Sequence, residues 1–224
     1  MKLSIIIPTF NEKDKIDSLL LQLSKLQGDF EVLFGDGGSC DGTVEKIQKK
    51  YAVIMSPKGR AKQMNMAALH STGEVLLFLH CDCRLPDDAI MQIQKAVDEG
   101  FKFGCFKIKF DSNKFLMKCC GFFSNIRVRL RRIAFGDQGI FITKKLFNEI
   151  GGFPDLPIME DYRLSIMLKR RCPLCQINSA ITASARKFEK EGILHTMWKM
   201  QKLQYAFRHG GDIYRIAGLY GGRG

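Results

Sequence analysis

The stretch VLLFLHCDCR, residues 75–84, decides the fold that we predict for this chain. Residues 75–79 are five consecutive apolar side chains, too few for a buried helix and typical of a buried strand. Asp82 follows the end of this strand, and Pro86 closes the segment. Ligands of open α/β sheets bind at the carboxyl ends of the strands, where a carboxylate can hold a divalent cation on a phosphorylated ligand. Taken alone, the pattern fits a solvated aspartate at the end of a strand better than a metal-binding one. The rest of the chain must decide between these two interpretations.

The residues before this stretch predict a parallel sheet. Three more short apolar segments read as strands, and a helical pattern follows each of them. The strands are expected at residues 3–8, 30–34 and 52–55, and the helices at 16–26, 44–51 and 59–68. We expect Asn11 to cap the first helix. Alternating strands and helices of this kind indicate an α/β fold with right-handed crossovers.

The second half of the chain is less regular. Helices are expected at residues 90–97, 112–135 and 158–168, and strands at 101–110, 136–143 and 174–184. From residue 189 a basic amphipathic helix leads to a glycine- and arginine-rich end that we expect to be frayed. The basic segment 112–135 has two open interpretations: a surface helix with snorkelling arginines, or a surface that binds a membrane or an acceptor.

Composition limits the classes of partner. The chain has 224 residues, is 46% hydrophobic and carries a formal net charge of +12, which favours nucleotides, phosphorylated substrates, acidic membranes or nucleic acid. We expect no signal peptide, so the eight cysteines are predicted to be reduced thiols in the cytoplasm. The CPLC segment at 172–175 lacks a second pair that would complete a zinc site. No apolar run approaches the ~20 residues of a membrane span.

Four ordered motifs resemble those of the family 2 glycosyltransferases, which have the GT-A fold. They are SIIIPTFNE at residues 4–12, DGGSCDGT at 36–43, HCD at 80–82, and GGF at 151–153 followed by Glu160-Asp161. Further segments are similar to a soluble bacterial branch named after radical-SAM and selenodomain proteins: GRAKQMN at 59–65, LHCDCRLP at 79–86, GDQ at 136–138 and SAR at 184–186. The resemblance covers roughly residues 3–170.

This resemblance implies a single GT-A domain with a central, mostly parallel sheet and a C-terminal helix. We expect the domain at residues 1–188, with a nucleotide-sugar-binding half at 1–86 and an acceptor half at 87–188. An amphipathic helical extension is expected at residues 189–224. The family's processive Gln-x-x-Arg-Trp motif is absent, so we predict the addition of a single sugar.

The resemblance also implies a nucleoside-diphosphate sugar of the UDP or GDP type as donor. The residues carried over as donor-binding are Pro8, Thr9, Asn11, Glu12, Asp36, Gly37, Arg60, Gln63 and Asp82. Thr9 and Glu12 would lie near the base and ribose, and Asp36 would accept a hydrogen bond from the base, since an ionised carboxylate only accepts. Arg60 would hold a phosphate. The glycines after Asp36 would equally serve a tight turn without a ligand, and Arg60 could equally be solvated.

A divalent cation, Mn²⁺ or Mg²⁺, is implied at Asp82 and His80. His80 stands where the family carries the first acid of Asp-x-Asp. An imidazole suits Mn²⁺ better than Mg²⁺, and a buried histidine without a ligand role is the alternative. The cation would neutralise charge on the leaving nucleoside diphosphate.

On the acceptor side, Asp161 is placed like the family's general base. It would take the proton of the acceptor hydroxyl during a single displacement that inverts the anomeric centre. Gln138, Glu160 and Arg186 are the expected acceptor contacts. Acidic residues at 160 and 161 would also suit a helix N-terminus with no catalytic role. A sugar, a lipid phosphate or a small molecule remains open as the acceptor.

Three other functions compete with an inverting transferase. Nucleotidyl transfer would need a glycine-rich phosphate loop after the first strand, where residues 8–11 are Pro-Thr-Phe-Asn. Nucleic-acid binding would need a recognisable motif among the basic residues, so no nucleic-acid partner is expected. A degenerate glycosyltransferase fold that binds nucleotide without transfer is the third alternative, and His80 favours it. We expect a cytoplasmic protein, with peripheral contact at the inner face of the membrane and a homodimer both left open.

Overall fold

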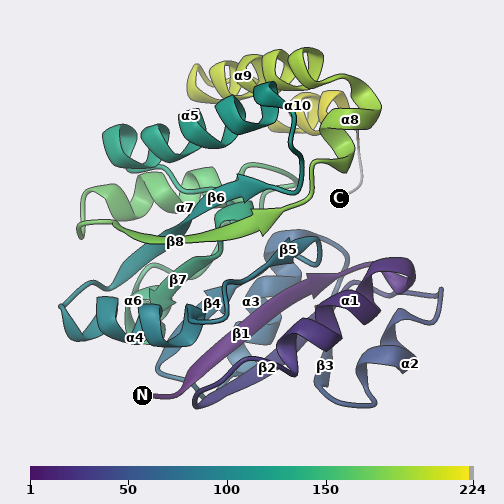
Figure 1. The fold of residues 1–224 in the computed structure, drawn as a ribbon, viewed down its shortest axis with the longest axis vertical. Coiled ribbons are helices and arrows are strands. Elements are labelled where there is room, and N and C mark those ends of the chain that lie inside the picture. Colours follow the sequence, from purple (N-terminus) through teal and green to yellow (C-terminus); the bar gives the residue numbers. More distant parts are fainter. Residues whose placement is uncertain (222–224) are drawn as a thin grey trace.

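The computed structural model describes residues 1–221, and it confirms the α/β fold (Figure 1). Within these residues, eight strands form one sheet in the order β3-β2-β1-β4-β7-β6-β8-β5. The strands are β1 (Leu3–Thr9), β2 (Phe30–Asp36), β3 (Ala52–Met55), β4 (Val75–Phe78), β5 (Cys83–Arg84), β6 (Phe103–Phe110), β7 (Ile140–Thr143) and β8 (Cys175–Ala183). The helices are α1 (Lys13–Leu23), α2 (Thr43–Ile47), α3 (Arg60–His70), α4 (Ala89–Asp98), α5 (Phe115–Arg131), the 3₁₀ turn η1 (Gly136–Gln138), α6 (Lys144–Glu149), α7 (Glu160–Lys169), α8 (Arg186–Glu191), α9 (Ile193–Arg208) and α10 (Ile213–Tyr220).

The N-terminal half of the sheet is parallel, as predicted. β1 pairs in parallel with both β2 and β4, and β2 pairs in parallel with β3. β7 then runs antiparallel to β4 and β6, while β8 lies parallel to β6. Because β1, β2 and β4 point the same way, the segments that follow Thr9, Asp36 and Phe78 all leave from one edge of the sheet.

The sheet is buried on both faces, which explains why β1 is a continuous apolar run. Leu3, Ile5 and Ile7 belong to one core cluster with residues of α1 and α4. Ile6 points the other way, into a second cluster with residues of α3 and α7. Alternate side chains of β1 therefore contribute to two hydrophobic clusters, one on each face of the sheet, and helices cover both faces.

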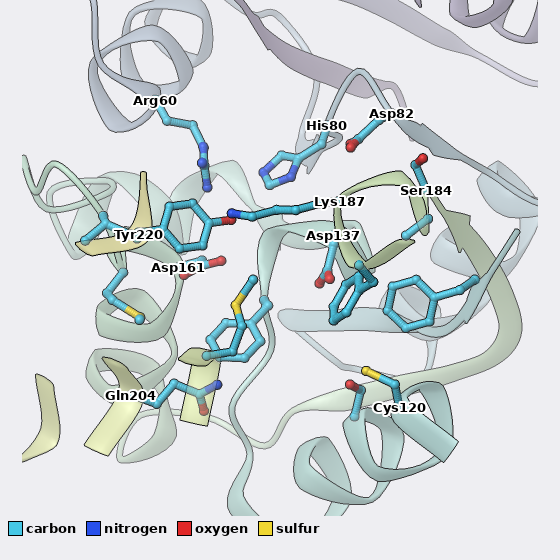
Figure 2. A pocket seen from close by; sticks show the side chains of 18 of the residues that line it. Arg60, His80, Asp82, Cys120, Asp137, Asp161, Ser184, Lys187, Gln204 and Tyr220 are labelled. Atoms are coloured by element: carbon cyan, nitrogen blue, oxygen red, sulfur yellow. The ribbon is translucent and has the colours of Figure 1, made fainter. Parts of the chain in front are cut away.

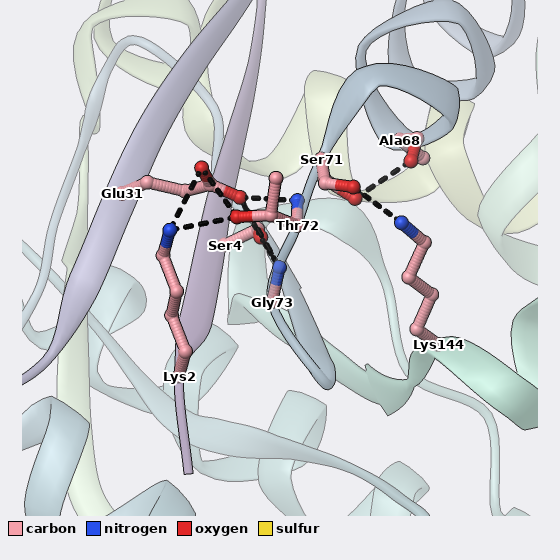
Figure 3. A network of polar contacts seen from close by, with 8 residues as sticks. All are labelled: Lys2, Ser4, Glu31, Ala68, Ser71, Thr72, Gly73 and Lys144. Carbon is pink, nitrogen blue, oxygen red and sulfur yellow. Dashed lines mark hydrogen bonds and ion pairs between the residues drawn. The ribbon is translucent and has the colours of Figure 1, made fainter.

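A polar network fixes the opposite edge of the sheet, at the N-terminal ends of β1 and β4 (Figure 3). The Glu31 carboxylate accepts hydrogen bonds from the Ser4 hydroxyl at 2.6 Å and from the Thr72 hydroxyl at 2.9 Å. Burial alone would raise the pKa of Glu31, but these bonds and an ion pair with Lys2 lower it to about 2. The network joins β1, β2 and the segment before β4 far from the edge where ligands would bind.

The expectation that Asn11 caps the first helix is wrong. Asn11 has a φ of 52° and accepts a hydrogen bond from the Cys40 amide at 3.0 Å, outside α1. The α1 terminus is instead capped from the next loop: Asp41 accepts from the Lys13 amide at 3.1 Å, and Thr43 accepts from the Glu12 amide at 2.9 Å. The glycine-rich segment after β2 thus holds the neighbouring helix as well as making its own turn.

Three expected elements differ in the second half. The segment expected as a strand at 136–143 begins with η1, and only Ile140–Thr143 joins the sheet. The short strand β5 was not expected. The C-terminal extension begins at α8, which crosses the expected boundary at residue 188, and it bends at Gly192, where φ is 88°.

The end that was expected to be frayed forms α10, and its residues 222–224 lie outside the described part of the chain. Asp212 begins α10 by accepting hydrogen bonds from the amides of Tyr214 and Arg215 at 2.8 and 3.1 Å. Ile216 then packs with Leu203 of α9 and with Ile133 and Tyr162 of the main domain. This contact explains the order of α10, which local composition does not reveal.

In residues 1–221 no helix combines the length and the apolar character that a bilayer crossing requires. All eight cysteines lie in this part of the chain, and each is a free thiol.

Candidate functional site

A pocket of about 1150 Å³ lies at the carboxyl ends of β1 and β4 (Figure 2). The sheet edge contributes Thr9, His80 and Asp82, and the opposite wall comes from α5, α7 and the C-terminal helices. Of the residues expected to bind the donor, Pro8, Thr9, Asn11, Glu12, Arg60, Gln63 and Asp82 line this pocket. Parallel strands therefore bring seven of the nine expected donor residues to one cavity.

Asp36 is placed differently from the expectation of a direct contact with the base. Its side chain is fully buried, and neither Asp36 nor Gly37 lines the pocket. One carboxylate oxygen accepts from the amides of Gly38 and Ser39 at 2.9 and 2.7 Å, and the other from the hydroxyls of Ser39 and Thr9 at 2.6 and 3.2 Å. All four acceptor positions are thus occupied. In this arrangement Asp36 orders the turn that follows β2.

Gln63 reaches the pocket wall, but its amide is used inside the fold. Its Nε2 donates to the carbonyl oxygens of Thr9 and Gly35, at 2.5 and 3.1 Å. It therefore ties the ends of β1 and β2 to α3. A Cβ at Gly37 would lie 3.0 Å from Gln63 Nε2, so a side chain at this position would press on the amide. Gln63 therefore uses its amide nitrogen to hold the ends of β1 and β2, and its Oε1 is left as the acceptor that it can offer to a ligand in the pocket.

Arg60 and Glu160 form an ion pair across the pocket wall, with 3.1 Å between Nη1 and Oε1. The Glu160 side chain is 2% exposed and the Arg60 side chain 35%. Burial raises the pKa of Glu160, while the positive charge of Arg60 opposes that rise. Glu160 does not line the pocket, and the contact that its side chain makes is with Arg60.

Gln138 and Arg186, the other expected acceptor contacts, also lie outside the pocket lining. Gln138 is fully buried, and its Oε1 accepts from Arg127 Nη2 at 2.7 Å and from the Phe135 amide at 3.2 Å. Arg186 is exposed. The adjacent Lys187 enters the pocket instead, with its Nζ 3.4 Å from the centre of the Tyr220 ring.

Asp161 is the second residue of α7 and faces the cavity (Figure 2). Its Oδ2 accepts from the Gly136 amide at 2.7 Å, and its Oδ1 from the Tyr162 amide at 2.6 Å. Met159, with a φ of 64°, turns the chain into the helix just before the acidic pair. Two backbone donors therefore fix the carboxylate, and each oxygen retains one acceptor position for a ligand.

His80 points into the same space as Asp161 (Figure 2). Burial, aided by the charge of Arg60, lowers the pKa of His80 to about 4, so the imidazole is neutral near pH 7 and able to bind a metal. The ring fits because residue 136 is glycine: a Cβ there would stand 2.4 Å from His80 Nε2.

The residues present fit a divalent cation that enters the pocket already bound to a diphosphate. Residues 1–221 contain no group of three or more His, Cys, Asp or Glu side chains arranged to hold a metal by themselves. Asp82 is exposed in the pocket, and His80 supplies a neutral nitrogen. Mn²⁺ and Mg²⁺ are commonly held by one or two protein ligands together with substrate phosphates, so two side chains suffice.

Asp137, Lys187 and Tyr220 are pocket residues that the sequence reasoning missed. Asp137 lay within the GDQ motif, and Lys187 directly followed the expected Arg186. Tyr220 gave no signal, because it lies in the end that was expected to be frayed. Burial raises the pKa of Asp137 to about 6, and its Oδ1 has no hydrogen-bond partner in the described chain. The ionised form of the Asp137 carboxylate is thus destabilised by its burial in the pocket.

The substitution Asp137→Asn is expected to stabilise the free protein at pH 8, by about 1–2 kcal/mol or roughly 3–6 °C in Tm. The native pKa, about 6, exceeds the ordinary value of 3.8, so the native state loses stability as the pH rises through this interval. The gain should therefore shrink between pH 7 and pH 5. Thermal melts across this range check it, with the exposed Asp87→Asn as control; a gain independent of pH would contradict the charge argument.

Comparison with known proteins adds the family. The model of the family "Glycosyl transferase family 2" matches residues 4–151. A dolichol-phosphate mannosyltransferase of Pyrococcus furiosus is 30% identical over 109 residues, which cover 45% of this chain and 31% of that protein. An uncharacterized glycosyltransferase of Haemophilus influenzae is 27% identical over 190 residues, 74% of this chain and 61% of that protein. The chain thus spans less than two thirds of either relative.

Solved structures share the fold. The mannosyltransferase PcManGT from Pyrobaculum calidifontis, in complex with GDP-Man and Mn²⁺, has a TM-score of 0.71 at 17% identity, over 97% of this chain and 67% of that one. S. aureus TarS 1-349 in complex with UDP-GlcNAc has a TM-score of 0.67 at 22% identity, over 82% of this chain and 58% of that one. The motifs, the sheet and the family match over residues 4–151 lead to one conclusion: this chain belongs to glycosyl transferase family 2.

Proposed function

We propose that this chain transfers a single sugar from a nucleoside-diphosphate sugar of the UDP or GDP type to an acceptor, with inversion and with a divalent cation. One observation carries the proposal: residues after β1, Asp82 after β4 and Asp161 at the start of α7 line one cavity. These are the positions where a donor base, a diphosphate and an acceptor are needed. The named relatives, a dolichol-phosphate mannosyltransferase among them, support the same reaction class.

Cationic side chains suit the diphosphate of the donor. Arg60 and Lys187 both line the cavity, and Figure 2 shows their head groups converging from opposite walls. Burial lowers the pKa of Lys187, so a bound anion would restore its preference for the charged form. Arg60 keeps its charge beside Glu160 and can offer its remaining N–H groups to a phosphate. Asp82 and His80 would hold the cation, which supplies Lewis-acid stabilisation of the leaving diphosphate.

Asp161 is the proposed general base. Its carboxylate is held by the Gly136 and Tyr162 amides, so it does not have to be ordered when the acceptor arrives. A free acceptor position on this carboxylate can take the proton of an attacking hydroxyl. One displacement at the anomeric carbon then forms the new bond as the nucleoside diphosphate leaves with its electron pair, which gives inversion.

A fold that binds nucleotide without transfer is the second candidate. Two observations favour it: His80 stands where the family carries an acid, so Asp82 is the only charged member of the implied pair of metal ligands, and each Asp161 oxygen already accepts a backbone hydrogen bond. The two candidates agree on donor binding and differ only in turnover. A binding assay followed by a transfer assay therefore separates them.

The first test is a thermal-shift panel of UDP, GDP, CDP, dTDP and their sugars, with and without Mn²⁺ or Mg²⁺. A ligand at ~100 times its Kd should add about 2.7 kcal/mol, or roughly 5–10 °C for a chain of this size. We expect a shift for UDP or GDP species that grows with the cation. Asp82→Asn should lose the cation-dependent part, because it removes the charged ligand.

Asp87→Asn is the matched control for this panel, since Asp87 is exposed and does not line the pocket. No shift with any nucleotide, from a folded sample, would refute donor binding. A shift that Asp82→Asn leaves unchanged would refute the metal assignment alone. A normal shift without sugar transfer or donor hydrolysis would select the second candidate.

A further inference from the structure

The pocket continues beyond the carboxylates into an apolar groove between α5 and α9, which contact each other (Figure 1). Phe123, Ile126 and Leu130 of α5 line one side of this α5–α9 groove. Leu194, Met197 and Trp198 of α9 line the other. A nucleotide sugar has no hydrocarbon that would require such a lining. The cavity, about 1150 Å³, also exceeds the usual range for one small ligand, so it has room for a second.

The side chains of the groove are unusually exposed for their type. Leu130 is 78% exposed, Leu194 65%, Phe123 61% and Trp198 59%. Single exposed apolar residues are common, but a set that lines one groove marks a binding surface. Phe115 and Phe122, 77% and 62% exposed, extend the apolar surface along α5. The occupant of the groove is therefore apolar over a considerable length.

The positive charge of α5 indicates the polar part of the molecule that occupies the groove. α5 carries Lys118, Arg127, Arg129 and Arg131 and no acidic residue. Arg127 is bound to Gln138 and lies over the Phe135 ring at 4.0 Å, so its guanidinium is already engaged. Arg131 lines the pocket and is exposed. An apolar groove on a basic helix matches a molecule with a hydrocarbon chain and an anionic group, which is the chemistry of a membrane lipid.

The reacting end of this lipid must suit the centre of the pocket. Asp82, Asp137 and Asp161 all line that region. Arg60 and Lys187, the cationic side chains of this region, are assigned to the donor diphosphate. A second phosphate brought up to the three carboxylates would therefore meet like charge, whereas a neutral hydroxyl can donate a hydrogen bond to one of them. The anionic group of the lipid is therefore better placed nearer Arg131, and its hydroxyl at Asp161.

We propose that the acceptor is an anionic membrane lipid whose hydrocarbon chain occupies the α5–α9 groove and whose head-group hydroxyl receives the sugar. This inference rests on the proposed transfer reaction and names its acceptor class. In the step, the lipid hydroxyl oxygen bonds to the anomeric carbon, its proton passes to Asp161, and the nucleoside diphosphate leaves with the electron pair. The products are a glycosylated lipid and the nucleoside diphosphate.

The test measures binding to vesicles and then transfer. The full chain is mixed with vesicles of phosphatidylcholine, alone or with 30% phosphatidylglycerol (about a third, which gives a strongly anionic surface), and bound protein is collected by flotation. We expect binding only to the phosphatidylglycerol vesicles, and labelled sugar from the donor in their lipid extract. Leu130→Glu and Trp198→Glu should each lower vesicle binding at least about tenfold, because a carboxylate in the groove repels both chain and charge.

Leu69→Glu is the matched control, because Leu69 is 75% exposed on α3, away from the groove. It should bind vesicles like the unchanged chain, and all three variants should keep the donor-induced thermal shift.

Groove variants that bind vesicles normally would overturn the proposal. So would a preference for phosphatidic acid, which lacks the hydroxyl, or equal transfer to glycerol phosphate, which lacks the chain. Vesicle binding without any donor shift would instead refute the transfer reaction and leave the lipid site standing.

Discussion

Asp161→Asn is expected to lower the rate of sugar transfer by ~10²–10⁴-fold, the usual effect of removing a general base. Asparagine keeps the size of the side chain and its one oxygen can still accept a hydrogen bond from the Gly136 amide, but the bond from the Tyr162 amide is lost, so a thermal melt must accompany the rate to show that the variant is folded. It cannot take the proton of the acceptor hydroxyl. Single-turnover transfer with saturating donor measures the effect directly, and the donor-induced thermal shift should not change.

Asp155→Asn supplies the control for this variant. Asp155 lies in the segment before α7, is 70% exposed and is within 3.5 Å of Lys62, so its loss should leave the rate within about twofold. A full rate in Asp161→Asn would remove the base assignment. A drop that is equally large in donor binding would give Asp161 a role in holding the donor instead of the acceptor.

Arg60→Ala is expected to lower the free energy of unfolding by about 2–3 kcal/mol, because it leaves the Glu160 carboxylate buried without its cation. The exposure of Arg60 keeps the cost below that of a fully buried pair. Without Arg60 the pKa of Glu160 rises further, so the native state holds a proton that the unfolded state releases. The loss should consequently be larger at pH 8 than at pH 5. Urea unfolding at both values measures it.

A double variant distinguishes charge from packing at this site. Adding Glu160→Gln to Arg60→Ala removes the unpaired charge while keeping the shape of the side chain, so much of the lost stability should return at pH 8. If the double variant is as unstable as Arg60→Ala, the loss comes from the packing of the arginine stem. Lys62→Ala, which breaks the exposed pair with Asp155, should cost within about 1 kcal/mol.

The sequence predicted that Thr9 and Asp82 would lie at the same edge of the sheet, for a physical reason; their role as donor ligands stays a prediction. The largely apolar runs at 3–8, 30–34 and 75–79 are too short for buried helices and predict strands. Once those strands are parallel, Thr9 and Asp82 must lie at one edge. Local pattern and global placement coincide here, because Thr9 ends β1 and Asp82 lies in the segment that leaves β4.

The other wall could not be predicted in this way. Lys187 and Tyr220 reach the pocket only because α8 to α10 pack back onto the domain, through contacts between Ile216, Leu203 and Ile133. No local period encodes such contacts. Asp36 and Gln138 fit the family motif in sequence, yet their side chains turn inward to hydrogen bonds with Ser39 and Arg127. A motif gives the position of a residue along the chain, while the direction of its side chain depends on partners far away in sequence.

The close approach of His80 and Gly136 has a consequence for how related chains can diverge. With a histidine at position 80, even an alanine at 136 would overlap the ring, so the two sites are not free to mutate independently. An aspartate at 80, the shorter side chain, would leave space for a larger residue at 136. Across related chains the two positions should therefore covary, with glycine at 136 wherever position 80 is histidine, and an alignment of related sequences checks this.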